Sequence, residues 1–387
     1  MEFLFWLSLL FILYTYAGFP CLLFVWSRLF PKKVNKAYPS EYPLVSVIIA
    51  ARNEEKNIKG RLKDLLKQDY PLDKMEVIVV SDGSTDKTNQ IVEEQAKMEA
   101  GKPDKGELGF KNLMLIEIPE SRGKPNAINV GVKKASADFI VFTDARQRFE
   151  PNAVKELLAN FNDPDVGCVS GELVFYEDSD TDIKAEMGFY WNLEKRVRKM
   201  ESAVGSVAGA TGAIYAIRKS LFSPLPEETL LDDVFIPMHV VFKGYRTVFD
   251  GEAVAYDTVS QDLAQEKRRK IRTLLGNYQL IKIMSGLLSS RKNPIFLRFL
   301  SHKILRLFVS FFFLGMLFTS LFATGITYKL AFLLCIVVLV LPLIDRAVKP
   351  IPLLGSISTL ARTFVSLNYF AFLAFVYLVK PGKKGLW

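Results

Sequence analysis

Long apolar segments at both ends of the chain enclose a polar middle, and this arrangement restricts the possible folds more than any other feature. No residue from Phe3 to Trp26 is charged, and at about 1.5 Å per helical residue such a run can cross a hydrocarbon core of roughly 30 Å. Half of all residues are hydrophobic, yet 24% are charged, so the charges must concentrate between the apolar ends. The sequence therefore predicts membrane segments on either side of one α/β domain.

The first apolar segment has the character of a retained membrane anchor, which we assign to residues 1–30. A cleavable signal peptide begins with basic residues, whereas here the cations Arg28, Lys32 and Lys33 follow the apolar run. The positive-inside rule then places the next domain in the cytoplasm. Three cysteines in the whole chain cannot form a disulfide framework, and this fits a reducing compartment.

Residues 301–387 contain about three further membrane segments. Their expected limits are Ile304–Thr327, Leu330–Ile344 and Ile351–Val379. The second segment is short and the third contains polar residues, so either one can be re-entrant or interfacial instead of a full crossing. Four crossings in total put the tail lysines outside, and three put them inside; these are Lys380, Lys383 and Lys384.

Residues 269–300 mix basic and apolar side chains at helical spacing, which predicts interfacial amphipathic helices, with a plain connecting helix as the alternative. The formal net charge of +9 by itself suits nucleic acid, anionic lipid or a phosphorylated substrate. Because many cations lie beside the apolar segments, lipid headgroups are the expected partner and nucleic acid is not.

The middle of the chain, residues 40–268, alternates short β-branched runs with amphipathic stretches, which predicts an α/β domain with a mostly parallel sheet. The expected strands are Leu44–Ile49, Glu76–Val80, Leu113–Ile118 and Phe139–Phe142, and the expected helices include Glu54–Gln68 and Lys124–Ala135. Open sheets of this class bind ligands beyond the carboxyl ends of their strands. The polar residues at those ends are therefore the candidates for a functional site.

Three motifs follow these strands in a specific order. Asn53-Glu54 comes after the first strand, Asp82-Gly83-Ser84-Thr85-Asp86 after the second, and a Gly-Lys-x-x-Ala-x-Asn stretch runs from Gly123 to Asn129. Together they resemble the inverting family 2 glycosyltransferases, which have the GT-A fold for binding nucleotide-sugars. The apolar ends resemble the membrane-integrated branch of that family, which includes polysaccharide synthases and glycolipid glucosyltransferases.

The resemblance implies a binding site for a UDP-sugar. In that family, residues matching Asp82, Asn53 and Glu54 hold the uridine base, the residue matching Lys124 lies near the nucleotide, and the residue matching Asp144 lies beside the diphosphate. These roles are expectations for this chain.

Leu231-Asp232-Asp233-Val234 matches a Glu-Asp pair of the family, so the resemblance implies that Asp233 is the catalytic base and Asp232 its neighbour. Adjacent carboxylates raise one another's proton affinity, which suits a base. The small-residue turn around Gly209, Thr211 and Gly212 matches the turn beside the acceptor. Small residues there let a sugar approach the backbone.

Basic residues after position 264 resemble the Gln-x-x-Arg-Trp motif of the membrane-bound synthases. Gln265 and Arg268 give the spacing, but Arg269 stands in place of the tryptophan, and a register from Arg269 to Arg272 fits equally well. The resemblance implies that at least one of these three arginines neutralises diphosphate charge. The missing tryptophan weakens the case for long-chain translocation.

Asp144-Ala145-Arg146 departs from the Asp-x-Asp motif of many relatives, in which the second Asp contacts a metal ion. Two interpretations remain open: Arg146 contacts phosphate directly, or Asp144 holds Mg²⁺ or Mn²⁺ together with the diphosphate and water. We favour the metal.

The leading functional hypothesis is an inverting enzyme that moves a sugar from a UDP-sugar to a lipid-linked or growing glycan acceptor at the cytoplasmic membrane face. One alternative is transfer of a single sugar to a lipid such as ceramide or a polyprenyl phosphate. Another is a non-catalytic membrane subunit of a glycan synthase. Few and short membrane segments make a narrow path for a polymer, so homo-oligomerisation is also considered.

Overall fold

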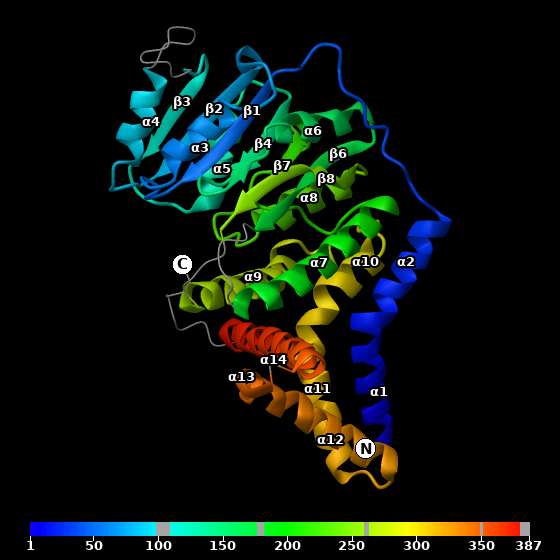
Figure 1. Cartoon of the computed structure of the whole chain (residues 1–387). Coiled ribbons are helices and arrows are strands. Elements are labelled where there is room, and N and C mark those ends of the chain that lie inside the picture. Colours follow the sequence, from blue (N-terminus) through cyan, green and yellow to red (C-terminus); the bar gives the residue numbers. More distant parts are fainter. Residues whose placement is uncertain (98–108, 176–181, 259–262, 349–350, 380–387) are drawn as a thin grey trace.

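The computed structural model of the chain describes residues 1–97, 109–175, 182–258, 263–348 and 351–379. Figure 1 shows a sheet with its flanking helices at one end and long apolar helices at the other, with α7 (Asp182–Ala203) and α9 (Leu263–Ile283) lying between them. The tail lysines Lys380, Lys383 and Lys384 lie outside the described residues.

One sheet of eight strands forms the middle of the molecule, in the order β3-β2-β1-β4-β7-β6-β8-β5. The strands are β1 (Val45–Ala51), β2 (Met75–Asp82), β3 (Leu113–Ile118), β4 (Phe139–Thr143), β5 (Arg148–Phe149), β6 (Val166–Phe175), β7 (Tyr215–Arg218) and β8 (Arg246–Asp257). Strands β1 to β4 pair in parallel, as expected. The other half is mixed, because β7 pairs antiparallel with both β4 and β6, and β5 pairs antiparallel with β8.

Strands β1, β2 and β4 of the parallel half are buried on both faces, which explains why they are nearly continuously apolar, whereas the edge strand β3 is partly exposed. Ile48 and Ile78 face one hydrophobic core, where α5 and α8 pack. Val47 and Val77 face a second core, where α3 and α6 pack. The helices of this region are α3 (Ile58–Leu65), α4 (Thr88–Ala96), α5 (Lys124–Lys134), α6 (Ala153–Ala159) and α8 (Asp232–Phe242).

Among the residues that the structure describes, four helical segments are long and apolar enough to cross a membrane: Glu2–Leu29, Phe296–Phe322, Ile326–Leu343 and Leu353–Val379. They correspond to the four apolar runs of the sequence. Their α-helical parts are α1 (Glu2–Leu13), α2 (Phe19–Leu29), α10 (Phe296–Phe299), α11 (Leu305–Phe322), α12 (Ile326–Val340) and α14 (Pro352–Val379), with α13 (Asp345–Val348) between the last two.

The first and second of these segments each contain one π-helical turn, Tyr14–Gly18 and Leu300–Ile304. The Tyr14 hydroxyl lies 2.8 Å from the Ser301 hydroxyl, so the two turns are joined by a hydrogen bond. This contact ties the amino-terminal helix to the helix that follows the α/β domain.

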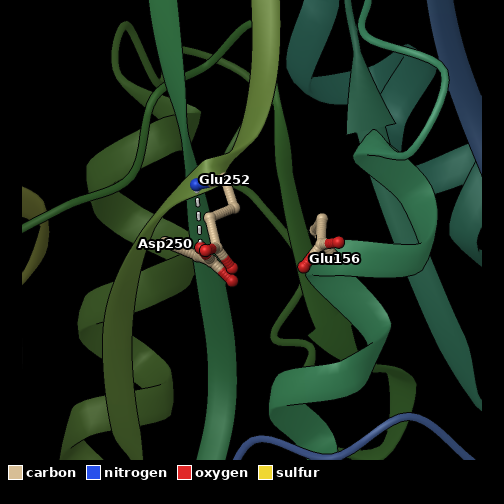
Figure 2. A group of neighbouring side chains, drawn as sticks. All are labelled: Glu156, Asp250 and Glu252. Carbon is tan, nitrogen blue, oxygen red and sulfur yellow. Dashed lines mark hydrogen bonds between the residues drawn. The ribbon is translucent and has the colours of Figure 1, made fainter.

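The linker between α2 and β1 is fastened to the domain by Lys36. Its ammonium nitrogen lies 2.6 Å from Glu156, 2.9 Å from Asp250 and 2.5 Å from Glu252. The Tyr38 hydroxyl also donates to Glu156, over 2.9 Å. Figure 2 shows that these three acids come from α6 and β8 and converge on one point.

Burial alone would lower the pKa of Lys36, but its hydrogen bonds to Glu156 and then Glu252 raise the pKa above the ordinary value. The lysine is therefore charged, and its one positive charge is shared by the three acids.

We expect the Lys36→Met substitution to destabilise the folded state, because it leaves three neighbouring carboxylates without a cation. The free energy of unfolding should fall by ~1–3 kcal/mol, since one partner of a partly buried charge group is lost. The measurement is the thermal unfolding midpoint of the detergent-solubilised protein. Lys33→Met is the matched control, because Lys33 is exposed on the same linker. Equal midpoints for the two variants would contradict the role of Lys36.

Candidate active site

The polar motifs of the first half of the sheet lie at one edge, as their positions after strands predicted. Ala51 pairs with Ser81 across β1 and β2, and Ile49 pairs with Thr143 across β1 and β4. Because these strands are parallel, Asn53, Asp82 and Asp144 follow at neighbouring points of the same edge.

Asp82 holds the loop before α5. Its carboxylate accepts hydrogen bonds from the Ser121 hydroxyl over 2.7 Å and from the backbone N–H groups of Arg122 and Gly123 over 2.8 and 2.9 Å. The turn after β2 needs a glycine, because Gly83 has a φ of 66° and a Cβ there would lie 2.6 Å from the Ser121 nitrogen. Asp82 thereby fixes where α5 and its first residue, Lys124, begin.

Asn53 and Glu54 connect the end of β1 to the turn after β2. The Asn53 side-chain oxygen accepts from the Thr85 N–H over 2.8 Å, and Asn53 has a φ of 55°, in the left-handed region that asparagine tolerates. The Glu54 N–H donates to the Thr88 hydroxyl over 2.8 Å. Asn53 is exposed and Glu54 is partly exposed, so both side chains can still meet a ligand at this edge.

Lys124 joins two acids from distant parts of the chain. Its ammonium nitrogen lies 2.9 Å from Asp144 Oδ1 and 3.4 Å from Asp232 Oδ1. Burial alone would lower the pKa of Lys124, but Asp144 and then Asp232 raise it above the ordinary value. The lysine is therefore a permanent cation between two carboxylates.

Asp232 and Asp144 differ in their exposure. Asp232 is buried, and the Tyr215 hydroxyl lies 3.4 Å from its Oδ2. The side chain of Asp144 is 40% exposed. Asp144 is therefore the acid of this pair that is open to an incoming ligand.

Asp233 is the second acid of the pair at the start of α8. Burial and then the adjacent Asp232 carboxylate raise its pKa to about 6, although Lys124 acts in the opposite direction. A carboxyl group with this pKa is ionised at neutral pH and accepts a proton more readily than an ordinary aspartate does. Asp233 is partly exposed, as a group that takes a proton from a bound acceptor must be.

The predicted acceptor turn lies directly against Asp233. The Ala210 N–H donates to the Asp233 carbonyl over 2.7 Å. A Cβ on Gly212 would lie 3.1 Å from Asp233 Oδ2, and one on Gly209 would lie 3.1 Å from Val234 Cγ2. A larger side chain at Gly212 would crowd the Asp233 carboxylate, and one at Gly209 would crowd Val234 and the Asp233 carbonyl. Thr211 is buried and accepts a hydrogen bond from Arg198 over 2.8 Å.

Arg268, Arg269 and Arg272 are exposed on α9. Gly276 of the same helix packs against Leu231, where a Cβ would lie 2.5 Å from Leu231 Cγ, and Gln279 accepts from the Leu230 N–H over 3.0 Å. Arg269 and Arg272 precede Gly276 by seven and four residues, so they share its helix face. The helix is thus fixed beside the start of α8, with these arginines one and two turns away.

Arg146 does not stand free beside Asp144. It forms an ion pair of 2.6 Å with Asp257, a buried residue of β8 that also accepts a hydrogen bond from Gln147 over 2.9 Å. To contact phosphate, Arg146 would therefore have to give up or share its ion pair with Asp257. Asp257 was not among the predicted site residues, because its pairing spans 111 positions of the sequence.

This site offers few protein ligands for a divalent cation. Asp144 offers an open carboxylate, while the second acidic position of the motif carries the paired Arg146. Within the described part of the chain, the group of three or more acids close enough together to hold an ion is Glu156, Asp250 and Glu252, and Lys36 already forms ion pairs with all three. Asp144 would therefore hold a cation mainly together with nucleotide oxygens and water, as Mg²⁺ commonly is.

Comparison with known proteins identifies the class of enzyme. The family described as Glycosyl transferase family group 2 matches residues 139–344, more than half of the chain, and the family described as Glycosyl transferase family 2 matches residues 46–225. The chain therefore belongs to the family 2 glycosyltransferases.

The fold is similar to that of a solved enzyme along nearly the whole chain. That structure is the mannosyltransferase PcManGT from Pyrobaculum calidifontis in complex with GDP-Man and Mn²⁺. It is 21% identical, with a TM-score of 0.71, and the match covers 98% of this chain and all of the other. The similarity confirms the GT-A fold together with the apolar helices at both ends.

Curated relatives match the middle of the chain. Poly-beta-1,6-N-acetyl-D-glucosamine synthase of Staphylococcus aureus (strain COL) is 22% identical over 65% of this chain and 59% of its own length. The probable glycosyltransferase YdaM of Bacillus subtilis (strain 168) is 27% identical over 66% of this chain and 60% of its own length. The chain thus spans about three fifths of the length of these relatives.

Proposed function

We propose that this protein transfers a sugar, with inversion, from a UDP-sugar to a lipid-linked or growing glycan acceptor at the cytoplasmic face of a membrane. One observation carries the proposal: the Lys124 ammonium lies between Asp144 and Asp232, beside the raised-pKa carboxyl of Asp233. A cation that can stabilise a diphosphate thus lies next to a base that can deprotonate a hydroxyl, and the chain belongs to a glycosyltransferase family.

In the proposed reaction, Asp233 takes the proton from the acceptor hydroxyl as its oxygen attacks the anomeric carbon. The bond from that carbon to the diphosphate breaks, and the diphosphate leaves with the electron pair. Lys124 stabilises the negative charge of the leaving group, with an arginine among Arg268, Arg269 and Arg272 as the second contributor. Gly209, Thr211 and Gly212 border the acceptor.

The nucleotide is proposed to bind at the edge formed by Asn53, Glu54 and the turn after Asp82. The structure adds a second role for Asp82, because its carboxylate fixes the loop before Lys124. Binding of the base at this turn would therefore also orient the lysine.

The proposed layout assigns residues 1–30 to an anchor, 40–268 to the catalytic domain, 269–300 to interfacial helices and 301–387 to membrane segments. The four apolar helices support it, and the similarity to a synthase of Staphylococcus aureus supports a glycan product. The direct test is transfer of radiolabelled sugar from a series of UDP-sugars in membranes. Mass analysis then separates a polymer from a single sugar added to a lipid. Absence of both transfer and UDP-sugar hydrolysis across the series would refute the proposal.

We propose that Asp144 helps to hold Mg²⁺ or Mn²⁺, which would supply positive charge to the diphosphate. We expect EDTA to abolish transfer and Mn²⁺ or Mg²⁺ to restore it. Asp144→Asn should weaken Mn²⁺ binding at least about tenfold when UDP is present, measured by calorimetry, because one of few protein ligands loses its charge. Asp138→Asn, an exposed acid at the other end of β4, is the control. Full transfer activity in EDTA would rule out the metal.

A further inference from the structure

Basic side chains gather where the domain meets the second apolar helix, on the Asp233 side of the site. Arg198 comes from α7, and Lys303 and Arg306 come from the first turns of the Phe296–Phe322 segment. Arg198 and Lys303 both act on the Asp233 carboxylate: each lowers its pKa, after the larger effects of burial, Asp232 and Lys124.

Arg198 connects this group to the acceptor turn. Its Nη1 donates to the Thr211 hydroxyl over 2.8 Å, and its Nε lies 3.5 Å from Glu194 Oε1. The other terminal nitrogen, Nη2, has no hydrogen-bond partner among the described residues. Arg198 can therefore donate to a further anion beside Thr211 without releasing its present partners.

The acids nearby already have other partners. Glu194 lies 2.9 Å from Arg306 and 3.1 Å from His302, and His302 also contacts Glu201 over 2.9 Å. The side chain of Lys303, by contrast, forms no hydrogen bond or ion pair with any residue that the structure describes. A partly buried ammonium without a close partner at the edge of an apolar segment is costly. An anionic ligand would remove that cost.

We propose that the acceptor is a glycan joined to a membrane lipid through phosphate, and that Arg198 and Lys303 bind this phosphate while the glycan hydroxyl reaches Asp233. The inference rests on the proposed function and specifies its acceptor. Lys303 belongs to the apolar Phe296–Phe322 segment and Arg198 contacts the acceptor turn, so a phosphate held by both would place its lipid beside that segment and its sugar toward Thr211. The reaction itself is unchanged: the hydroxyl oxygen forms the new bond, Asp233 takes the proton, and the lipid phosphate stays intact.

The test measures binding of two probes to the purified full-length protein in phosphatidylcholine nanodiscs. The first probe is N-acetylglucosamine joined through diphosphate to farnesol, and the second is the same sugar linked directly to farnesol. We expect the wild type to bind the diphosphate probe at least about tenfold more tightly, as charge-assisted hydrogen bonds to phosphate imply. Lys303→Met and Arg198→Gln should each remove most of this preference.

Lys329→Met is the matched control, because Lys329 is an exposed lysine at the start of α12, and it should keep the preference. The proposal is overturned if the wild type binds both probes equally, or if both variants retain the preference. A misfolded variant loses affinity for both probes, so the ratio separates folding from phosphate recognition.

Competition with an anionic lipid separates recognition of the acceptor from general binding of membrane lipids. If phosphatidylglycerol in the nanodisc displaces the diphosphate probe as effectively as unlabelled probe does, the cations bind membrane lipids in general and the acceptor claim fails. UDP-sugar hydrolysis by the same preparation is measured separately. Its absence counts against the proposed function, whereas hydrolysis without probe preference counts only against this inference.

Discussion

Asp233→Asn is expected to reduce sugar transfer by about a thousandfold, which lies within the range of general-base contributions. The amide cannot accept the proton of the acceptor hydroxyl, while the shape of the side chain is kept. Binding of the UDP-sugar, measured by calorimetry, should change little, because Lys124 and Asp144 remain. Asp138→Asn is the control for loss of an exposed acid. Ordinary turnover by Asp233→Asn would refute the assignment of the base.

The pH dependence of the wild type tests the same assignment. Because the pKa of Asp233 is about 6, kcat/KM should fall about tenfold per pH unit below pH 6, as the base becomes protonated. Stability depends on pH in the opposite direction from activity: ionisation of Asp233 raises the activity but lowers the stability of the fold. A carboxyl whose folded-state pKa exceeds its unfolded value of ~4 loses its stabilising contribution as the pH rises through the folded pKa. Asp233→Asn should therefore unfold at a higher temperature than the wild type at pH 7.5.

Lys124→Met is expected to lower transfer at least about a hundredfold, because it removes the cation that faces the leaving diphosphate. It should also lower the free energy of unfolding by ~1–3 kcal/mol, since buried Asp232 and nearby Asp144 lose their shared partner. Lys124 opposes the rise in the pKa of Asp233. Without it, the acid limb of the residual activity should move to a pH above 6, and a pH series of kcat/KM measures this shift.

Lys134→Met provides the control for Lys124→Met, because Lys134 is exposed at the end of the same helix. Lys124→Arg tests geometry as well as charge. A guanidinium group is larger and planar and places its charge and donors differently from a compact ammonium group, so this variant should recover stability more than activity. Transfer by Lys124→Met within twofold of the wild type would contradict the role of this lysine in catalysis.

The parallel half of the sheet could be predicted from the sequence because its strands are nearly continuous apolar runs, of which β1, β2 and β4 are buried on both faces. The antiparallel half could not be predicted in the same way. Strand β6 includes the charged residue Glu172, and β8 includes Asp250 and Glu252. The pairing of β6 with β8 is also interrupted twice by register shifts. These strands depend on the strands with which they pair rather than on a local sequence pattern.

The candidate site likewise has a part that could be predicted from the sequence and a part that could not. Asp144 follows a predicted strand, so its position at the sheet edge could be inferred from the sequence. The partners of Arg146 and Thr211 could not, because Asp257 and Arg198 reach them from other elements. The structure brings Lys124, Asp144, Asp232 and Asp233 together, as expected from the motifs, and adds Tyr215 as a hydroxyl facing Asp232.

The fastening of the linker by Lys36 has a consequence for how such an enzyme would work at a bilayer. A flexible linker would let the catalytic domain move away from the membrane surface and meet acceptors that extend to different distances from it. Here the ammonium joins the linker after α2 to both α6 and β8, which restricts how far the domain can move away from the end of α2. We expect this restraint to favour acceptors whose hydroxyl lies close to the membrane surface over acceptors that extend far from it.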